Sequence, residues 1–395
     1  MSFTINNGAD SPLESIYATD YWIVNKWFGD RLWGWGQDNY GQLGDNARTN
    51  QSVPVQSVSS VGTWKLVACA DQHSAAIKTD GTLWTWGYNT FGALGDNTTS
   101  HKSSPVQTVA GGTNWKVVTS GSNINAAIKT DGTLWVWGNN GNGQLGDGTT
   151  TVRTSPVQTI SGSINWKQVS CGISYMAAIK TDGTLWLWGY NGGSVLGDNT
   201  ASAKSSPVQT VAGGSNWSSV ACGYLHTMAT KTDGTLWTWG SNTYGQLGTN
   251  NNTNVASPVQ TVSGGTNWKQ VACGYSHSVA TKTDGTLWTW GRDDYGQLGD
   301  NSNTHKSSPV QTVAGGTNWK QISCGHRHYT TALRTDGTLW TWGVNTSGQL
   351  GDSSVVSRRS SPVQVYGNST NWKSVYCGGF HALAIQINNI NTTGT

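Results

Sequence analysis

Hydrophobic and polar residues alternate in short runs along this chain, and the clearest run is Leu-Trp-Thr-Trp-Gly at 83–87. Alternation with period two, just after the tight-turn pair Asp80-Gly81, is typical of a β-strand that leaves a hairpin. The same pattern recurs at 32–36, 134–138, 185–189, 236–240, 287–291 and 339–343, with a period of 51 residues and one spacing of 52. A period in this range on short aromatic strands predicts a propeller rather than separate domains.

Three further patterns recur around this one and complete a four-stranded unit. Strand A reads Trp-Lys-x-Val-x-Cys-Gly, as at 268–274, and strand B runs through small residues into Lys-Thr-Asp-Gly, as at 278–285. Strand C is the Leu-Trp-x-Trp-Gly pattern, and strand D is Ser-Pro-Val-Gln-Thr-Val, as at 257–262, whose proline fits an outer edge strand. We therefore expect an all-β fold, a seven-bladed β-propeller with four-stranded antiparallel blades.

The two ends of the chain carry incomplete units. The first unit lacks strands A and B, whereas the last, from 372 to 385, lacks strands C and D. Pairing of the N- and C-terminal strands would complete a blade and remove two exposed sheet edges. The predicted organisation is an N-terminal extension at 1–28, a propeller at 29–386 whose composite blade joins 29–58 to 372–386, and a C-terminal tail at 387–395. The aromatic segment 21–28 is a second candidate for the strand B place in that blade.

The repeat resembles that of the regulator of chromosome condensation family. The shared wording is Leu-Trp-x-Trp-Gly-x-Asn-x-x-Gly-Gln-Leu-Gly, as at 236–248, followed by Pro-Val and Cys-Gly-x-x-His. The resemblance covers 29–386 and implies a seven-bladed β-propeller, and its regular wording is similar to bacterial and phage members. The best-known member is a guanine-nucleotide exchange factor for a small nuclear GTPase and also holds nucleosomes, so the resemblance implies nucleotide exchange as an alternative function.

Two departures from that member speak against nucleotide exchange. It carries a basic N-terminal tail, whereas the first 25 residues here contain no Lys or Arg. It also carries an insertion that wedges into the GTPase, whereas the unit spacing here never changes by more than one residue.

Composition adds bounds on chemistry and location. Tryptophan occurs 23 times, and three per unit account for 21 of these, which we interpret as core between blades. Six cysteines recur at one equivalent position per unit, so we expect buried, unpaired thiols and no shared metal. A net charge of +3 argues against a nucleic-acid partner, and no apolar run is long enough for membrane insertion. The first 15 residues lack the features of a Sec-type signal peptide, so we expect a cytoplasmic or virion-associated protein.

Candidate catalytic motifs are absent from the sequence. It has no nucleophile elbow, no phosphate-binding loop and a single glutamate, so we expect no enzyme, no cofactor and no metal site. Histidines at 73, 226, 277, 328 and 381 recur beside strand B and are interpreted as structural. The cations that end strand B are interpreted as a solvated rim paired with turn aspartates. Because every blade needs the consensus positions for its fold, departures from the repeat and the loops are the candidates for function.

The loops between strands C and D are the predicted partner-binding elements, because exposed Tyr and Phe beside Arg suit protein or glycan recognition. The candidate residues are Tyr40, Phe91, Tyr244, Arg292, Asp293, Asp294 and Tyr295, with His326 and Arg327 in one A–B turn. We predict a non-catalytic protein-interaction or structural module with an unidentified protein partner. One version is a component of a larger assembly such as a phage virion or surface structure, with 1–28 as docking segment. A glycan-binding lectin and an exchange factor remain alternatives.

Overall fold

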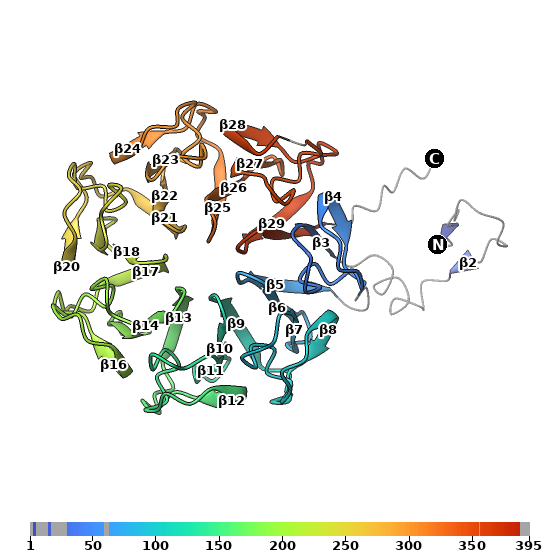
Figure 1. Ribbon diagram of the computed structural model, residues 1–395, viewed down its shortest axis with the longest axis horizontal. Helices are drawn as coiled ribbons and strands as arrows, with labels where there is room; N and C mark the ends of the chain where they lie inside the picture. Colours follow the sequence, from blue (N-terminus) through green and yellow to red (C-terminus); the bar gives the residue numbers. More distant parts are fainter. Residues whose placement is uncertain (1–2, 5–14, 17–29, 59–62, 355, 388–395) are drawn as a thin grey trace.

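A computed structural model describes residues 3–4, 15–16, 30–58, 63–354 and 356–387 of this protein. Its strands form seven four-stranded antiparallel sheets arranged around a common axis (Figure 1). Within each blade strand A is innermost and strand D is outermost. A separate pairing joins β1 (Phe3–Thr4) to β2 (Ser15–Ile16). The predicted all-β, seven-bladed propeller is confirmed, and no helix within the described ranges is long and apolar enough to cross a membrane.

Strands of one type have nearly the same length in every blade. Strand A is β5 (Trp64–Cys69), β9 (Trp115–Ser120), β13 (Trp166–Cys171), β17 (Trp217–Cys222), β21 (Trp268–Cys273), β25 (Trp319–Gly325) and β29 (Trp372–Cys377). Strand B is β6 (His73–Lys78), β10 (Ile124–Lys129), β14 (Tyr175–Lys180), β18 (His226–Lys231), β22 (His277–Lys282), β26 (Tyr329–Arg334) and β30 (His381–Gln386). Strand C is β3 (Arg31–Gly36), β7 (Leu83–Gly87), β11 (Leu134–Gly138), β15 (Leu185–Gly189), β19 (Leu236–Gly240), β23 (Leu287–Gly291) and β27 (Leu339–Val344). Strand D is β4 (Gln51–Gln56), β8 (Lys102–Gln107), β12 (Arg153–Gln158), β16 (Lys204–Gln209), β20 (Val255–Gln260), β24 (Lys306–Gln311) and β28 (Arg358–Gln364).

Blade 1 is the composite blade, in which the two ends of the propeller meet in the order β29-β30-β3-β4. β3 pairs with β30 without a break from Arg31↔Gln386 to Gly36↔His381. The predicted closure of the ring by N- and C-terminal strands is therefore confirmed, and β30 occupies the strand B place. The competing segment 21–28 lies outside the described residues. Blades 2 to 7 follow in chain order from β5–β8 to β25–β28.

Tryptophan side chains form the core between neighbouring blades. Trp86 of strand C is fully buried, and its indole N–H donates a 2.8 Å hydrogen bond to the backbone carbonyl of Gln42 in blade 1. The equivalent bond joins every pair of neighbouring blades. Trp64 of strand A packs against Trp86 with ring centroids 6.0 Å apart. These rings confirm the predicted core, in which one Trp→Ala change costs about 3–5 kcal/mol.

Local side-chain bonds build the turn between strands B and C. The Asp80 carboxylate accepts hydrogen bonds from the backbone N–H of Thr82 at 2.9 Å and from its hydroxyl at 2.7 Å. That hydroxyl in turn accepts the indole N–H of Trp84 at 2.8 Å. Gly81 has φ +81°, and a Cβ at this position would overlap the carbonyl group of Thr113 in the next blade. The recurrent sequence Asp-Gly-Thr-Leu-Trp therefore stabilises this turn and allows its contact with the next blade.

The cation that ends strand B packs between two indole rings. The ammonium group of Lys180 lies 5.0 Å from the ring centroid of Trp166 and 4.5 Å from that of Trp186. Equivalent contacts are made by Lys78, Lys129, Lys231, Lys282 and Arg334. Apart from the buried Lys78 these cations are partly exposed, and the pKa of Asp131 is lowered by hydrogen bonds from Thr133 and also by the charge of Lys129. The interpretation as a solvated rim paired with turn aspartates therefore holds in part, but it left out the cation–π contacts that each cation makes within its own blade.

Candidate functional site

The A–B turns and the C–D loops lie on one face of the ring, here called the first face, because strand direction alternates within each blade. The C–D loops reach over the next blade. In blade 1, a Cβ on Gly41 would overlap the backbone of Ser103 in β8, so this glycine allows the loop to approach closely. Side chains from neighbouring blades therefore meet on the first face.

One buried side chain organises each C–D loop. In blade 2 the side-chain oxygen of Asn89 accepts a hydrogen bond from the N–H of Leu94 at 2.8 Å. The amide group of the same side chain donates to Asp96 at 3.1 Å and to the carbonyl oxygens of Thr98 and Ser100. The hydrogen bonds of this one buried asparagine thus determine the shape of the loop, and solvent-exposed residues do not.

Aspartate replaces this asparagine in blades 1 and 6. Asp38 accepts from the N–H of Leu43 at 2.8 Å, and Asp293 accepts from the N–H of Leu298 at 2.9 Å. Burial raises the pKa of Asp38 to about 8 and that of Asp293 to about 7. Asp293, one of the predicted partner-binding residues, is therefore buried beneath its loop, where it supports the exposed residues around it.

Four predicted residues lie together on the loops of blades 5 and 6. The guanidinium carbon of Arg292 lies 4.8 Å from the ring centroid of Tyr244 and 6.0 Å from that of Tyr295. Its Nε also donates to the carboxylate of Asp294 at 2.5 Å. His305 completes the cluster, with its ring 5.1 Å from that of Tyr244 and its Nε2 3.6 Å from Asp294. Arg292 is therefore held in place by two rings and one carboxylate.

This cluster continues inward toward the A–B turns as a row of planar side chains. Tyr295 stacks on His328 with centroids 5.3 Å apart, and His328 lies 5.0 Å from Tyr275. Tyr275 stacks on Tyr224 at 4.1 Å with an interplanar angle of 12°. Burial, together with the charge of Arg292, lowers the pKa of His328 to about 4, so this imidazole is neutral near pH 7. We call Tyr224, Tyr275, His328, Tyr295, Arg292 and Tyr244 the aromatic strip; all six are partly exposed.

The two remaining aromatic candidates lie away from the strip, on the loops of blades 1 and 2. Tyr40 packs edge-to-face on Tyr88 at 4.9 Å and on His101 at 5.1 Å. Tyr88 and His101 stack on each other at 4.9 Å. Phe91 is partly buried on the blade 2 loop. The structure therefore divides the predicted loop residues into two groups on different parts of the ring (Figure 1).

His326 and Arg327 belong to a contact that ties A–B turns together near the ring axis. Asp71, from the turn of blade 2, accepts a 2.9 Å bond from His326 of blade 7 and a 3.0 Å bond from Ser122 of blade 3. Arg327 lies 3.7 Å from the same carboxylate and 5.8 Å from the Phe380 ring. Burial opposes ionisation of Asp71, but the hydrogen bond from His326 and the charge of nearby Arg327 lower its pKa to about 2. We call Asp71, Ser122, His326 and Arg327 the ring clasp.

The histidines at the start of strand B join neighbouring blades. The Nε2 of His381 lies 3.0 Å from the hydroxyl of Ser74, which donates to the carbonyl of Gln42. Equivalent bonds pair His73 with Asn125, His226 with Ser278 and His277 with Thr330. These histidines are structural, as predicted, and burial lowers the pKa of His381 to about 3.

His328 was expected in this histidine set, and that expectation is wrong. One extra residue in the A–B turn of blade 7 places Tyr329 at the start of β26, where it pairs with Gly343. The hydroxyl of Tyr329 donates to the carbonyl of His381, and His328 moves out into the turn with φ +67°. The insertion frees His328 for the aromatic strip. Across the described ranges, no three His, Cys, Asp or Glu side chains form a group that could hold a metal.

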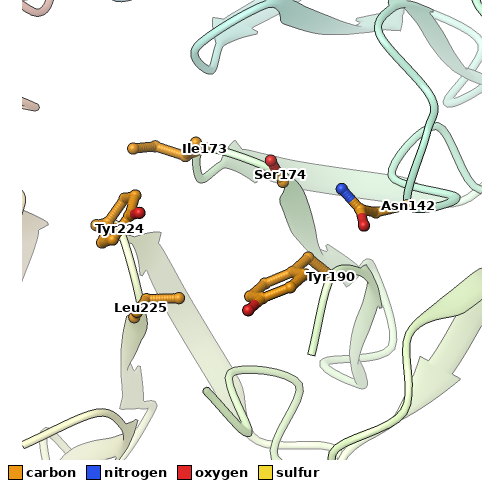
Figure 2. Close-up of a pocket in the computed structure, with 6 residues that line it drawn as sticks. All are labelled: Asn142, Ile173, Ser174, Tyr190, Tyr224 and Leu225. Carbon is orange, nitrogen blue, oxygen red and sulfur yellow. The ribbon is translucent and has the colours of Figure 1, made fainter. Parts of the chain in front are cut away.

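A pocket of about 240 Å³ adjoins the inner end of the strip, where blades 3, 4 and 5 meet. Its lining residues are Asn142, Ile173, Ser174, Tyr190, Tyr224 and Leu225. Figure 2 shows Ile173, Tyr224 and Leu225 on one side of this space and Asn142 and Tyr190 on the other. None of the six is charged, and Tyr224 belongs to both the pocket and the strip.

Sequence reasoning missed the pocket and the inner half of the strip. The signal was present in the second residue of each A–B turn, which takes six different types in seven blades: Asp71, Ser122, Ile173, Tyr224, Tyr275, His326 and Gly379. Because the preceding Cys-Gly is nearly constant, this variation marks a place where the fold does not require one residue type. That the C–D loop residues, His326 and Arg327 contact a partner remains a prediction.

Comparison with known proteins places the chain in a family. The family model described as RCC1-like domain matches residues 28–384. The ultraviolet-B receptor UVR8 of Arabidopsis thaliana is 34% identical over 340 residues, which cover 84% of this chain and 76% of that protein. The E3 ubiquitin-protein ligase HERC2 of Homo sapiens is 30% identical over 380 residues, which cover 92% of this chain but 8% of that protein.

Solved structures show the same fold at lower identity. Human WBSCR16 superposes with a TM-score of 0.81 at 22% identity and covers 92% of this chain and 100% of its own. Prp20p of Saccharomyces cerevisiae superposes with a TM-score of 0.79 at 18% identity and covers 95% of this chain and 96% of its own. With its seven blades, its repeat and the family match over nearly its whole length, the chain belongs to the RCC1-like domain family.

Proposed function

We propose that this chain is a protein-interaction module that binds its partner through the first face, with the aromatic strip as the contact surface. The observation that carries the proposal is the continuous row of six partly exposed planar side chains from three blades. Tyr and Arg are enriched in the centres of protein interfaces, where they supply contact area and hydrogen bonds together.

The strip is also held in place before any partner arrives. Arg292 is fixed by Asp294 and two tyrosine rings, and Tyr275 is fixed by Tyr224 on one side and His328 on the other. Side chains that are already ordered lose little conformational entropy on binding. The strip therefore has the properties of a pre-organised interface rather than of a solvated loop surface.

The packing of the rings favours a protein over a glycan. A sugar binds an aromatic side chain by stacking on the face of its ring, but the strip rings are stacked on one another or on a guanidinium group. Ring faces occupied in this way are not free for a sugar, whereas phenol hydroxyl groups suit contacts with a polypeptide. The lectin alternative therefore has less support from this geometry.

The names of relatives support a protein partner. The Prp20p structure is described together with its binding to Gsp1p and histones, although at 18% identity that likeness shows the fold alone. HERC2 is named as a ligase, yet the chain spans only 8% of its length, so ligase activity is not transferred. Exchange of guanine nucleotide remains an alternative that release of a fluorescent nucleotide from a captured GTPase would test.

The version in which this protein docks into a virion through 1–28 has no support from these relatives, which are plant and mammalian proteins. Most of that extension lies outside the described residues. A cytoplasmic or virion-associated location likewise remains a prediction.

The proposal is tested by affinity purification from native cells with quantitative mass spectrometry. The double variant Tyr275→Ala/Arg292→Ala should lower capture of the partner at least tenfold. The control is Tyr40→Ala/Tyr88→Ala, which removes two packed planar side chains from blades 1 and 2 and should retain the partner. Thermal unfolding of both variants checks that the ring is intact. Equal capture by the wild type and the strip variant would contradict the proposal.

A further inference from the structure

We propose that the pocket between blades 3, 4 and 5 is an anchor site for one aromatic side chain, Tyr or Phe, of an extended segment in the protein partner. The inference rests on the proposed function, because the pocket opens beside the strip and shares Tyr224 with it. Four observations support it: the equivalent niche elsewhere in the ring, the neighbouring loop, the size of the pocket and its chemistry.

The chain itself fills the equivalent niche between blades 1 and 2. There the ring of Tyr40 lies 4.9 Å from that of Tyr88 and 5.1 Å from that of His101. In the repeat, Asn142 stands where Tyr40 stands, and Tyr190 stands where Tyr88 stands. Between blades 3 and 4, therefore, the tyrosine wall is kept and the ring that would cover it is missing.

The aromatic residue is missing at this loop position in blades 3, 4 and 7, but after blade 7 the wall position in blade 1 is Gln37 and not a tyrosine. Phe91, Tyr244 and Tyr295 provide an aromatic residue at the same loop position in blades 2, 5 and 6. Ala203 also replaces His101 beside Tyr190, which removes a second ring from the niche. A tyrosine-shaped space is thus left open in one niche and occupied by the chain's own ring in its counterpart.

The neighbouring loop leaves the other wall uncovered. Gly193 occupies the aromatic position in the C–D loop of blade 4. A Cβ at this glycine would already lie 3.4 Å from the side chain of Leu225, so a larger side chain there would cover Leu225. Two consecutive loops therefore lack their aromatic residue, and the pocket lies between them.

The size of the pocket fits one side chain. Its volume of about 240 Å³ exceeds the roughly 150 Å³ of a cavity that accepts benzene. It falls below the approximately 300–1,000 Å³ typical of sites for cofactors and drug-sized ligands. A single Tyr or Phe side chain is the ligand of matching size, and a protein partner is the natural source of one.

The chemistry of the lining agrees. Ile173 and Leu225 provide apolar contacts, and Tyr190 and Tyr224 provide ring contacts of the kind that Tyr40 makes with Tyr88. The amide of Asn142 and the hydroxyl of Ser174 can bond a phenol group or the backbone of the partner. An uncharged lining disfavours a Lys, Arg, Asp or Glu anchor, because the charged group would lose water without a partner.

The inference predicts how a bound segment runs. Tyr224 forms a wall of the pocket and stacks on Tyr275, so a segment anchored in the pocket continues along the strip toward Arg292. The anchor supplies apolar burial, and the strip supplies hydrogen bonds. Most of the binding energy of an interface resides in a few such buried anchors, so the pocket should dominate affinity.

The test uses a random twelve-residue peptide library displayed on phage and selected on the immobilised full-length protein. Enriched peptides, made with a fluorescein label, are then titrated by fluorescence anisotropy. We expect the enriched sequences to share a Tyr or Phe, and its replacement by Ala to raise Kd at least tenfold. Asn142→Tyr, which fills the niche as Tyr40 fills its own, should raise Kd by a similar factor without lowering Tm.

Two further variants keep the test decisive. Tyr40→Asn opens the counterpart niche between blades 1 and 2 and should leave Kd unchanged. Leu225→Asp alters the pocket from a different blade and covers the case in which Asn142→Tyr fails to fold. Enriched peptides without a shared aromatic residue, or an unchanged Kd in both pocket variants, would overturn the anchor site.

The test of the anchor site can fail or succeed independently of the test of the proposed function. If Tyr275→Ala/Arg292→Ala loses the native partner while Asn142→Tyr keeps it and its peptides, the interaction surface stands and the anchor is wrong. If the selected peptides depend on Asn142 while the strip variant keeps the native partner, the anchor stands and the strip is not the partner's contact surface.

Discussion

At the residue scale, two aspartates stand where the fold uses an asparagine. The amide of Asn89 donates to Asp96, and a carboxyl group can make the same donation only when it is protonated. In blade 1, Asp45 stands where Asp96 stands in blade 2. Burial raises the pKa of Asp38, and the proximity of the Asp45 carboxylate raises it further. Asp38 therefore replaces asparagine well only in its neutral form.

This argument predicts that Asp38→Asn stabilises the protein in a pH-dependent way. The pKa of Asp38 is about 8 in the folded state and about 3.9 in the unfolded state, so the folded state retains a proton that the unfolded state releases. The free energy of unfolding of the wild type is therefore not reduced by Asp38 below pH 4. Between pH 4 and 8 the reduction grows by up to about 1.4 kcal/mol per pH unit, and above pH 8 it is constant.

Urea unfolding of both proteins at a series of pH values measures this difference. The gain from Asp38→Asn should grow from pH 4 to pH 8 and then level off. Asp294→Asn is the control, because it makes the same carboxyl-to-amide change at a partly exposed position. A gain that does not vary with pH would show that Asp38 is ionised in the folded state.

At the element scale, the turns between strands B and C depend on a glycine for two reasons. Gly81 has φ +81°, and its α-carbon faces the carbonyl of Thr113 in blade 3 so closely that a Cβ would overlap it. Gly111, in the D–A connection of the same blade, also has a positive φ of +55°, but a Cβ there would meet nothing within 4 Å.

The two glycines predict different costs of substitution by alanine. Gly111→Ala should cost about 1 kcal/mol, because only the backbone conformation is disfavoured. Gly81→Ala should cost at least about 3 kcal/mol, because the overlap also forces blades 2 and 3 apart. The free energy of unfolding from urea titration checks this, and equal losses in the two variants would contradict the inter-blade argument.

The strands and loops differ in how far they could be predicted from the sequence. Blade number, strand order and ring closure could be predicted, because each rests on a consensus repeated in every unit. The aromatic strip could not be predicted in full, since Tyr275 and Tyr295 are 20 residues apart and are bridged by His328 from another blade. The insertion that separates His328 from Tyr329 is one residue long and leaves the periodicity of the repeat nearly intact. The pocket was not predicted, because it results from small side chains at loop positions where other blades carry aromatic rings.

At the scale of the whole molecule, the ring is closed without a covalent bond, and the ring clasp crosses the closure. Blade 1 joins the two ends of the chain through β3 and β30. Asp71 links blade 2 to Ser122 of blade 3 and, past blade 1, to His326 of blade 7. The backbone N–H of His326 also donates to the carbonyl of Gly378 in blade 1, so four consecutive blades are tied at the axis.

The clasp predicts that Asp71→Asn destabilises the closure. Without the Asp71 carboxylate, the hydrogen bond from the buried His326 loses its charged acceptor, and such a loss costs about 1–3 kcal/mol. The pKa of Asp71 is about 2 when folded and about 3.9 when unfolded, so this contribution is present above pH 4 and is lost as pH falls through 2. Hydrogen exchange should show the loss of protection first in β3 and β30, because these strands open when the ends separate.

A double-mutant cycle separates the clasp from a general loss of packing. Asp71→Asn, His326→Asn and the double variant should be strongly non-additive, because each single change already breaks the same contact. Lys373→Gln is the control: Lys373 pairs with Asp30 in blade 1 at 2.5 Å, but its side chain is 46% exposed, so its loss should cost less than about 1 kcal/mol. Additive losses for Asp71 and His326 would mean that the strand pairing of blade 1 alone holds the ring closed.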